Sequence, residues 1–392
     1  MLIVELFLLV YFFYVVGYAL TFALAGYSYK NIVGGAQSSF LKFVVLVPSY
    51  KEDNVILDVA RKSVQQNYPA ENFQVFIIAD SLKPETLAEL RGLPVSVIEV
   101  SFENSTKVKS LNRALELIRE DAYDYAVILD ADNVMEVDFL EKMNALIVRL
   151  GYKAVQGQRK PKNRNNNLAF LDGVSEAINN HIYRQGTVAM GLSASIAGSG
   201  VVFDYKLLKD KLSRMNSVGG YDRELELKFL QEGERVYYHK DAVVYDEKVS
   251  RNQSFQNQRK RWIFSQYFYL AKYFNEGCRA LFKGNFIFFN SAVLRNIQLP
   301  RLINLGLLTL LTFASVLLHE RLILGREIWI ALFLVNSFAI LISIPREFYS
   351  KEMLKAIFSL PGIFVNMFLL LFRLRHVNKK FTHTQHEVVS QE

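Results

Sequence analysis

Residues 126–132 read AVILDAD, an apolar run that leads straight into two aspartates. A short continuous apolar run between polar residues is typical of a buried strand in a parallel sheet. Asp130 and Asp132 follow that strand and can lie near each other in an irregular turn. Hard oxygen ligands of this kind suit Mg²⁺ or Mn²⁺, which typically also binds substrate phosphates. The D-x-D pattern alone is weak evidence, because a turn followed by a helix N-cap gives the same letters.

Two earlier strands are predicted to end in the same way. FVVLV at residues 43–47 leads into PSYKED, and VFIIA at residues 75–79 leads into Asp80. A further strand and three helices are predicted at Val95–Val100, Val55–Val64, Ser110–Arg119 and Asp138–Leu150. Alternating strands and helices predict βαβ units, in which ligands bind beyond the carboxyl ends of the strands. We therefore expect acidic groups from three strands at one edge of a mostly parallel α/β sheet.

Long apolar runs flank this region. Residues 2–26 are interrupted only by Glu5 and exceed the roughly 20 residues needed to cross a bilayer. Three later runs lie near the lower length limit, at Leu302–Leu318, Ile328–Ile344 and Ala356–Phe372. A cleaved secretory signal is the alternative for the first run, but that run lacks a basic leading region. The sequence thus predicts an integral protein of an inner or plasma membrane.

The predicted organisation has five parts. They are a transmembrane helix (1–27), a cytoplasmic catalytic domain (28–277), an interfacial amphipathic segment (278–300), transmembrane or re-entrant helices (301–373) and a basic tail (374–392). With the domain in the cytoplasm, three spans after it would put the basic tail outside, against the positive-inside bias. We therefore expect Ala356–Phe372, which Pro361-Gly362 interrupts, to be re-entrant or interfacial, or else Asn285–Leu294 to cross as well.

Charge and cysteine content narrow the function classes. The net charge of +8 fits the positive-inside bias of a membrane protein and could also attract anionic headgroups or an anionic substrate. The basic residues form no compact stripe with interleaved aromatics, so no nucleic-acid partner is expected. Cys278 is the single cysteine, which excludes an intramolecular disulfide and suits a reducing compartment.

Seven motifs extend the pattern around residues 126–132. In chain order they are VPSYKED, IIAD, KSLNRAL, LDAD, AGSGVVF, YDRELELKFLQEG and QRKRW. Together they resemble glycosyltransferase family 2, most closely its membrane-bound branch, which includes cellulose, hyaluronan, chitin and mannan synthases and ceramide glucosyltransferase. The resemblance covers about Phe43 to Trp262. It implies a GT-A fold, an α/β nucleotide-sugar-binding domain.

The resemblance also implies roles for individual residues. Donor binding, from a UDP- or GDP-sugar, is implied for Tyr50, Glu52, Asp80, Lys109 and Asp130, and binding of Mg²⁺ or Mn²⁺ for Asp132. A role at the acceptor or diphosphate is implied for Gly198, Ser199, Gly200, Gln258, Arg261 and Trp262. Chemically, a guanidinium can pair with diphosphate oxygens and an indole can stack on a sugar. A basic amphipathic helix at the membrane surface also explains the last three residues.

The general base is predicted with one departure from the family pattern. The family usually has Thr-Glu-Asp before a helix, whereas this chain has Gly220-Tyr221-Asp222. We assign the base to Asp222, with Glu224 and Glu226 as competitors. The expected reaction is transfer with inversion to a growing polysaccharide or glycan. The alternatives are single addition to a lipid acceptor, nucleotidyl transfer, and an inactive membrane scaffold, which Tyr221 in place of an acid would allow.

Overall fold

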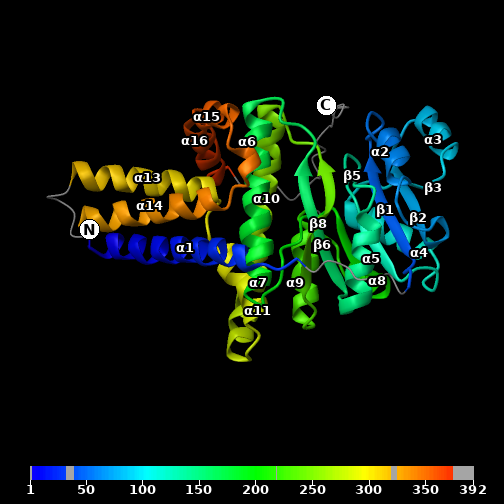
Figure 1. The fold of residues 1–392 in the computed structure, drawn as a ribbon, viewed down its shortest axis with the longest axis horizontal. Helices are drawn as coiled ribbons and strands as arrows, with labels where there is room; N and C mark the ends of the chain where they lie inside the picture. Colours follow the sequence, from blue (N-terminus) through cyan, green and yellow to red (C-terminus); the bar gives the residue numbers. More distant parts are fainter. Residues whose placement is uncertain (1, 32–38, 218, 319–324, 374–392) are drawn as a thin grey trace.

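The structure, a computed structural model, describes residues 2–31, 39–217, 219–318 and 325–373. The predicted basic tail lies outside these residues. An α/β domain and a bundle of apolar helices lie at opposite ends of the molecule, with the long helix α10 (Asn252–Phe282) between them (Figure 1). This single helix runs across the boundary that we predicted at residues 277/278.

The α/β domain is built on one eight-stranded sheet in the order β3-β2-β1-β4-β7-β6-β8-β5. Its strands are β1 (Phe43–Tyr50), β2 (Phe73–Asp80), β3 (Ser96–Val100), β4 (Tyr125–Ile128), β5 (Val134–Met135), β6 (Ala154–Pro161), β7 (Val201–Asp204) and β8 (Val236–Asp246). The four predicted strands are confirmed and run parallel as β3-β2-β1-β4. The other half is mixed, because β7 runs antiparallel to both β4 and β6.

The register of the parallel strands aligns their polar ends. Tyr50 at the end of β1 pairs with Asp80 at the end of β2. On the other side, Leu46 pairs with Ile128, so Asp130 follows β4 at the same edge. The predicted gathering of acidic groups at one sheet edge is therefore confirmed.

Helices cover both faces of the sheet. On one face lie α2 (Ile56–Ser63), α3 (Pro84–Arg91) and α5 (Phe139–Leu150), and on the other lie α4 (Lys107–Leu117), α8 (Tyr205–Ser213) and α9 (Tyr221–Gln231). Successive residues of β1 point alternately into the two cores, as strand geometry requires: Val45 into the first, Leu46 into the second. Helix α4 begins three residues before our prediction because the Thr106 hydroxyl caps it, accepting from the amide of Lys109 at 3.3 Å.

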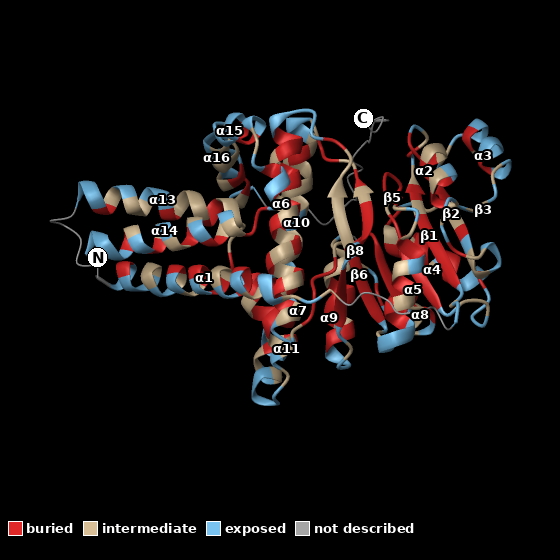
Figure 2. Cartoon of the chain, viewed as in Figure 1, coloured by how far each residue is buried: buried red, intermediate tan, exposed pale blue. Residues whose placement is uncertain are grey.

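Three apolar helices lie side by side and point away from the sheet: α1 (Leu2–Ser28), α13 (Arg301–Leu317) and α14 (Arg326–Ile342) (Figure 1). Their outer faces are exposed and apolar (Figure 2), with Phe7 71% and Phe13 70% exposed. An exposed apolar surface of this extent is typical of a surface that contacts a membrane or another protein. By length and composition, α1 can cross a membrane alone.

Two bent helix pairs could raise the number of spans to three among the described residues. The first joins residues 286–297 to α13 at 53° and begins with α11 (Phe286–Phe289), a π-helical turn (Asn290–Leu294) and α12 (Arg295–Ile297). The second joins α15 (Lys351–Ile357) to α16 (Leu360–Leu371) at 46°. In Figure 1 this second pair lies beside α6 (Asn167–Asn180) and α10, away from the outer end of the bundle.

Candidate active site

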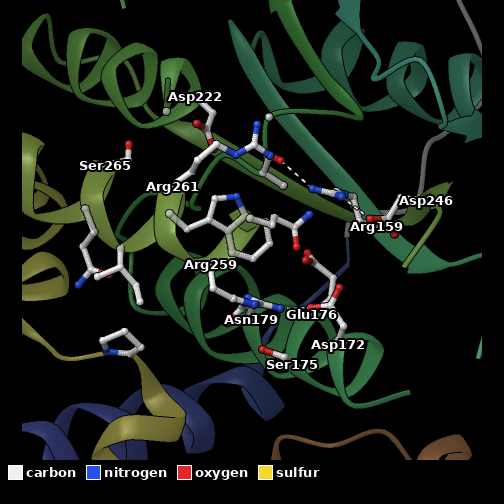
Figure 3. A pocket seen from close by; sticks show the side chains of 18 of the residues that line it. Arg159, Asp172, Ser175, Glu176, Asn179, Asp222, Asp246, Arg259, Arg261 and Ser265 are labelled. Carbon is white, nitrogen blue, oxygen red and sulfur yellow. Dashed lines mark hydrogen bonds and ion pairs between the residues drawn. The ribbon is translucent and has the colours of Figure 1, made fainter. Parts of the chain in front are cut away.

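One large cavity of about 950 Å³ opens at the carboxyl edge of the sheet. Its walls come from the ends of β1, β2 and β4, from α6, α9 and α10, and then from the apolar helices. Figure 3 shows Asp222 and Arg261 on one side of this space and the α6 side chains Asp172 and Glu176 on the other. The cavity therefore joins the polar sheet edge to the bundle of apolar helices.

The predicted nucleoside-binding residues lie together at the sheet end of the cavity. Tyr50, Glu52 and Asp80 all line it, and Asp80 is buried. Lys51 and Ser81, which directly follow the two paired strand ends, have φ of 57° and 59°. Left-handed backbone is costly for residues other than glycine and clusters at functional sites. The turns that follow β1 and β2 therefore hold a backbone conformation that costs free energy, which is typical of turns at functional sites.

Lys107 was missed by sequence reasoning. Its ammonium contacts the Asp130 carboxylate and donates to the Gly198 carbonyl at 3.0 Å. Burial acts to lower the pKa of Lys107, but the Asp130 carboxylate outweighs it and the pKa is raised, so the cation is firmly charged. Lys109, the predicted donor contact, instead donates to the Asn104 carbonyl at 2.8 Å and does not line the cavity. Residues two apart on a helix face different sides, which explains why Lys107 lines the cavity and Lys109 does not.

Asp132 is buried at the cavity wall. One oxygen of its carboxylate accepts from the Glu247 amide at 3.3 Å, and its backbone carbonyl accepts from Lys162. Burial lowers the pKa of Lys162. Among the described residues no three His, Cys, Asp or Glu side chains gather at one point. The donor set thus fits a divalent ion that takes its remaining ligands from a diphosphate and water, rather than a complete protein cage.

Asp222 lies in the first turn of α9 and lines the cavity. Burial raises the pKa of its carboxyl group. The neighbouring Tyr221 donates to the Gly198 carbonyl at 2.5 Å, and the Lys107 ammonium lies 4.9 Å from its ring centroid. Tyr221, which stands where the motif usually has an acid, therefore fixes the start of α9 against the loop Gly198-Ser199-Gly200, which we call the glycine loop.

The two competing acids of α9 are bound elsewhere. Glu224 accepts from Lys272 at 2.7 Å and from the Tyr269 hydroxyl at 3.2 Å. Glu226 is fully buried, ion-pairs with Arg295 and accepts from the Ile196 amide at 3.0 Å. Neither carboxylate lines the cavity. Position therefore favours Asp222 as the base.

The glycine loop contributes unevenly to the site. Gly198 lines the cavity with φ of 80°, and a Cβ there would lie 3.5 Å from the Asp222 Cβ. Ser199 is buried, and its hydroxyl accepts from the Asp130 amide at 2.9 Å. A Cβ at Gly200 would lie 2.9 Å from Val244, so only glycine fits. The loop thus holds the D-x-D turn, and Gly198 alone of the three faces the cavity.

Helix α10 brings the Q-x-x-R-W residues Gln258, Arg261 and Trp262 to the cavity wall. Burial lowers the pKa of Arg261, although Asp130 opposes the shift. The Arg259 guanidinium lies 4.3 Å from the Trp262 ring centroid and also pairs with Asp172. Arg259 therefore covers part of the indole that we predicted to stack on a sugar.

Further buried ion pairs of the wall were invisible in the sequence. Arg159 pairs with Asp246, and Arg184 pairs with Glu176 at 2.7 Å. Their partners come from different elements, so no local pattern marks them. Electrostatically they neutralise the acids of β8 and α6 before any ligand binds.

Comparison with known proteins agrees with this geometry. The family model described as "Glycosyltransferase like family 2" matches residues 42–265, more than half of the 392-residue chain. No curated protein matches the chain by sequence. The mannosyltransferase PcManGT from Pyrobaculum calidifontis, solved with GDP-Man and Mn²⁺, is similar with a TM-score of 0.57 and 17% identity, covering 90% of this chain and 92% of that one. At that identity the likeness shows the fold alone.

Two further solved structures are more distant. Glucosyl-3-phosphoglycerate synthase from Mycobacterium tuberculosis, with Mn²⁺, UDP and phosphoglyceric acid, has a TM-score of 0.40 and 14% identity, covering 57% of this chain and 76% of that one. TarS 1-349 from S. aureus, with UDP-GlcNAc, has a TM-score of 0.40 and 16% identity, covering 58% and 66%. These TM-scores are too low to carry an argument.

Proposed function

The chain belongs to the glycosyltransferase like family 2, and from that premise we propose that it is an inverting, membrane-integral glycosyltransferase. It moves a sugar from a nucleotide-sugar donor to an acceptor hydroxyl at the membrane. The observation that carries this proposal is the single cavity, which connects the acidic sheet edge and Asp222 with the apolar helices. Such a cavity lets a polar donor and a membrane-bound acceptor meet at one carboxylate.

The donor binds at the sheet edge in this proposal. Tyr50, Glu52 and Asp80 hold the nucleoside, and Asp130 orients the sugar. Lys107 takes over the role that we had expected of Lys109, because its ammonium already lies beside Asp130. A divalent ion held by Asp132 would supply positive charge to the diphosphate when bound.

Asp222 is the general base. Its carboxylate removes the proton from the acceptor hydroxyl while that oxygen attacks the anomeric carbon, and the bond to the nucleoside diphosphate breaks with its electron pair leaving on the diphosphate. The raised pKa of Asp222 brings its basicity closer to what proton removal near neutral pH requires. Arg261 lines the same cavity, and its fixed positive charge stabilises the negative charge that develops on the leaving nucleoside diphosphate.

A membrane arrangement follows for the domains. With the catalytic domain in the cytoplasm of an inner or plasma membrane, α1 enters from outside, the bent pair of residues 286–297 and α13 leads out, and α14 returns, although its 17 residues are at the lower length limit for a span (Figure 1). The bent α15–α16 pair then stays at the cytoplasmic surface beside α6 and α10. The described chain then ends on the cytoplasmic side at residue 373, which agrees with the positive-inside bias for the basic residues that follow in the sequence.

The shape of the cavity favours a lipid acceptor over a growing polysaccharide. Its far end lies among apolar side chains of α13, α14 and α16 rather than in a polar passage. A polymer passage is expected to present polar groups and aromatic platforms along its length. Single addition to a lipid is therefore our first choice, with polysaccharide synthesis as the second.

The test is release of nucleoside diphosphate by the protein purified in detergent with Mg²⁺ or Mn²⁺, screened over nucleotide sugars. We expect Asp222→Asn to lose about 10²–10⁴-fold in turnover while donor affinity is kept. Glu224→Gln is the matched control, since this acid of the same helix is bound to Lys272 outside the cavity. Normal transfer by Asp222→Asn would refute the base assignment, and no release from any donor would favour an inactive scaffold.

A further inference from the structure

The cavity does not end at the catalytic groups. Beyond them its wall is formed by mainly apolar side chains of the apolar helices and by two hydroxyl side chains, namely Leu305, Thr309, Phe333, Ser337, Ile363 and Met367. The Thr309 hydroxyl is used up within its own helix, donating to the Leu305 carbonyl at 2.7 Å. This part of the cavity, which we name the tail groove, offers dispersion and burial but little hydrogen bonding.

Arg301 stands where the polar wall gives way to the tail groove. It is the first residue of α13, and Arg301, Leu305 and Thr309 are spaced four apart, so they follow one face of that helix. At about 1.5 Å per residue, Thr309 lies roughly 12 Å further along the helix than Arg301. The guanidinium is thus at the mouth of the groove and the apolar residues are deeper.

Arg301 has no carboxylate in direct contact within the described residues, although Glu176 lies near enough to act on its charge. Its Nη2 donates to the backbone carbonyl and the hydroxyl of Ser175, both at 3.0 Å, and its Nη1 is buried with no hydrogen-bond partner. Within the described part of the chain no carboxylate lies within ion-pairing distance of Arg301. The nearby acids of α6 are already taken, Asp172 by Arg259 and Glu176 by Arg184.

A cation left unpaired in a largely buried wall costs free energy unless an anion joins it. Guanidinium groups bind phosphate through two parallel hydrogen bonds, a geometry that suits a fixed arginine at a cavity wall. A neutral lipid head would leave this cation unpaired. The missing anion is therefore to be sought on the ligand that also fills the tail groove.

We propose, building on the proposed function, that the acceptor is a membrane lipid whose head carries a phosphate between its hydroxyl and its hydrocarbon chains. Its hydroxyl reaches Asp222, its phosphate binds Arg301 and its chains occupy the tail groove. A glycerophospholipid with a hydroxylated head and a sugar-bearing polyisoprenoid diphosphate share this chemistry. Both have the order hydroxyl, phosphate and hydrocarbon, which the proposal assigns to Asp222, Arg301 and the tail groove along one cavity.

The experiment uses the full chain in phosphatidylcholine nanodiscs with the active donor. Each disc preparation carries phosphatidylinositol, a polyprenyl diphosphate sugar or a neutral glycosylated diacylglycerol, and labelled lipid is measured by mass spectrometry beside nucleotide release. We expect labelling of a phosphate-bearing lipid, and which of the two is labelled identifies the source. Equal labelling of the neutral lipid would overturn the inference but leave the transferase intact, whereas no nucleotide release with any lipid would overturn the proposed function itself.

Two pairs of variants test the contacts. Arg301→Gln should raise KM for the phosphate lipid about tenfold or more without changing nucleotide affinity, and Arg301→Lys should recover part of the loss. Arg326→Gln is the matched control, because Arg326 also begins an apolar helix but lies outside the cavity. An unchanged KM in Arg301→Gln would contradict phosphate binding at this residue.

The second pair of variants tests the tail groove without changing Arg301, so it can be used even if the Arg301 variants fold poorly. Ser337→Trp fills the tail groove and should abolish transfer to a long-chain lipid while a short-chain analogue with the same head is still labelled. Phe338→Trp changes the adjacent residue, which is exposed and outside the cavity, and should behave as the unaltered protein. If both tryptophan variants act alike on both lipids, the chains do not bind in the groove.

Discussion

The buried ion pair between Arg295 and Glu226 is expected to hold α9, the helix that carries Asp222, against α12. The side chains are 5% and 1% exposed, and they join α12 to α9 one turn beyond Asp222. Arg295→Met would leave the Glu226 carboxyl group buried beside the Ile196 amide at 3.0 Å and Arg223 at 3.9 Å, and because burial already raises the pKa of Glu226 to about 7, the group can take up a proton instead of staying charged. Breaking one side of a buried pair costs about 3–5 kcal/mol, and the two remaining partners place our expectation near the lower figure.

A matched pair on the same helix provides the comparison. Glu224 pairs with Lys272 at 2.7 Å, but the Lys272 side chain is 45% exposed. The Glu224 side chain is itself only 6% exposed but keeps the Tyr269 hydroxyl at 3.2 Å, so Lys272→Met should cost about 1–2 kcal/mol, less than Arg295→Met. The double change Arg295→Met with Glu226→Met should regain much of the loss, because an apolar pair can replace a buried ion pair at little cost.

The assay is the free energy of unfolding from denaturant titration in one detergent, measured together with turnover. We expect Arg295→Met to lose turnover as well, because α9 carries Asp222 and would shift with Glu226. Equal and small losses in Arg295→Met and Lys272→Met would refute the reasoning. So would a destabilised Arg295→Met that keeps full turnover, since the pair would then stabilise the fold without positioning the base.

Three further outcomes are expected. Because burial raises the pKa of Asp222, kcat/KM should fall as pH falls through that raised value. The variant Asp222→Asn should show no such fall at acid pH. It should also unfold at a higher temperature at neutral pH, because it removes a buried charge that costs stability. Lys107→Met should raise KM for the donor about tenfold or more in initial-rate assays, by losing a charged contact to the diphosphate. Gly186→Ala should destabilise by about 1–3 kcal/mol in thermal unfolding, since its Cβ would meet the Phe22 carbonyl oxygen at 2.1 Å, whereas Gly17→Ala, with nothing within 4 Å, should be neutral or slightly stabilising.

Much of the catalytic edge could be predicted because its signals are local. Each parallel strand is a short apolar run; Asp80 ends β2, and Asp130 and Asp132 come within four residues of the end of β4, so chain direction alone carried them to one edge. Asp222 and the Q-x-x-R-W residues lie in contiguous motifs on α9 and α10, and all of them line the cavity.

Choices between neighbouring residues needed the helix positions. Lys107 and Lys109 differ by two positions in one motif, and the start of the helix at the Thr106 cap decides which of them faces the cavity. Similarly, Asp222, Glu224 and Glu226 stand within five residues, yet Lys272 and Arg295 from distant elements take the last two.

The sequence by itself determined the family, the apolar segments and the acidic strand ends, because each depends on residues that are adjacent in the chain. Only the tertiary structure decided the mixed half of the sheet and the cavity that unites Asp222 with the tail groove, whereas the interruption of Ala356–Phe372 was already expected from Pro361-Gly362. The position of Arg301 without a carboxylate in direct contact among the described residues belongs to this second group, because it depends on which acids α6 gives to Arg259 and Arg184. Pairings of this kind form between residues far apart in sequence, and their energies depend on burial and distance that no local pattern encodes.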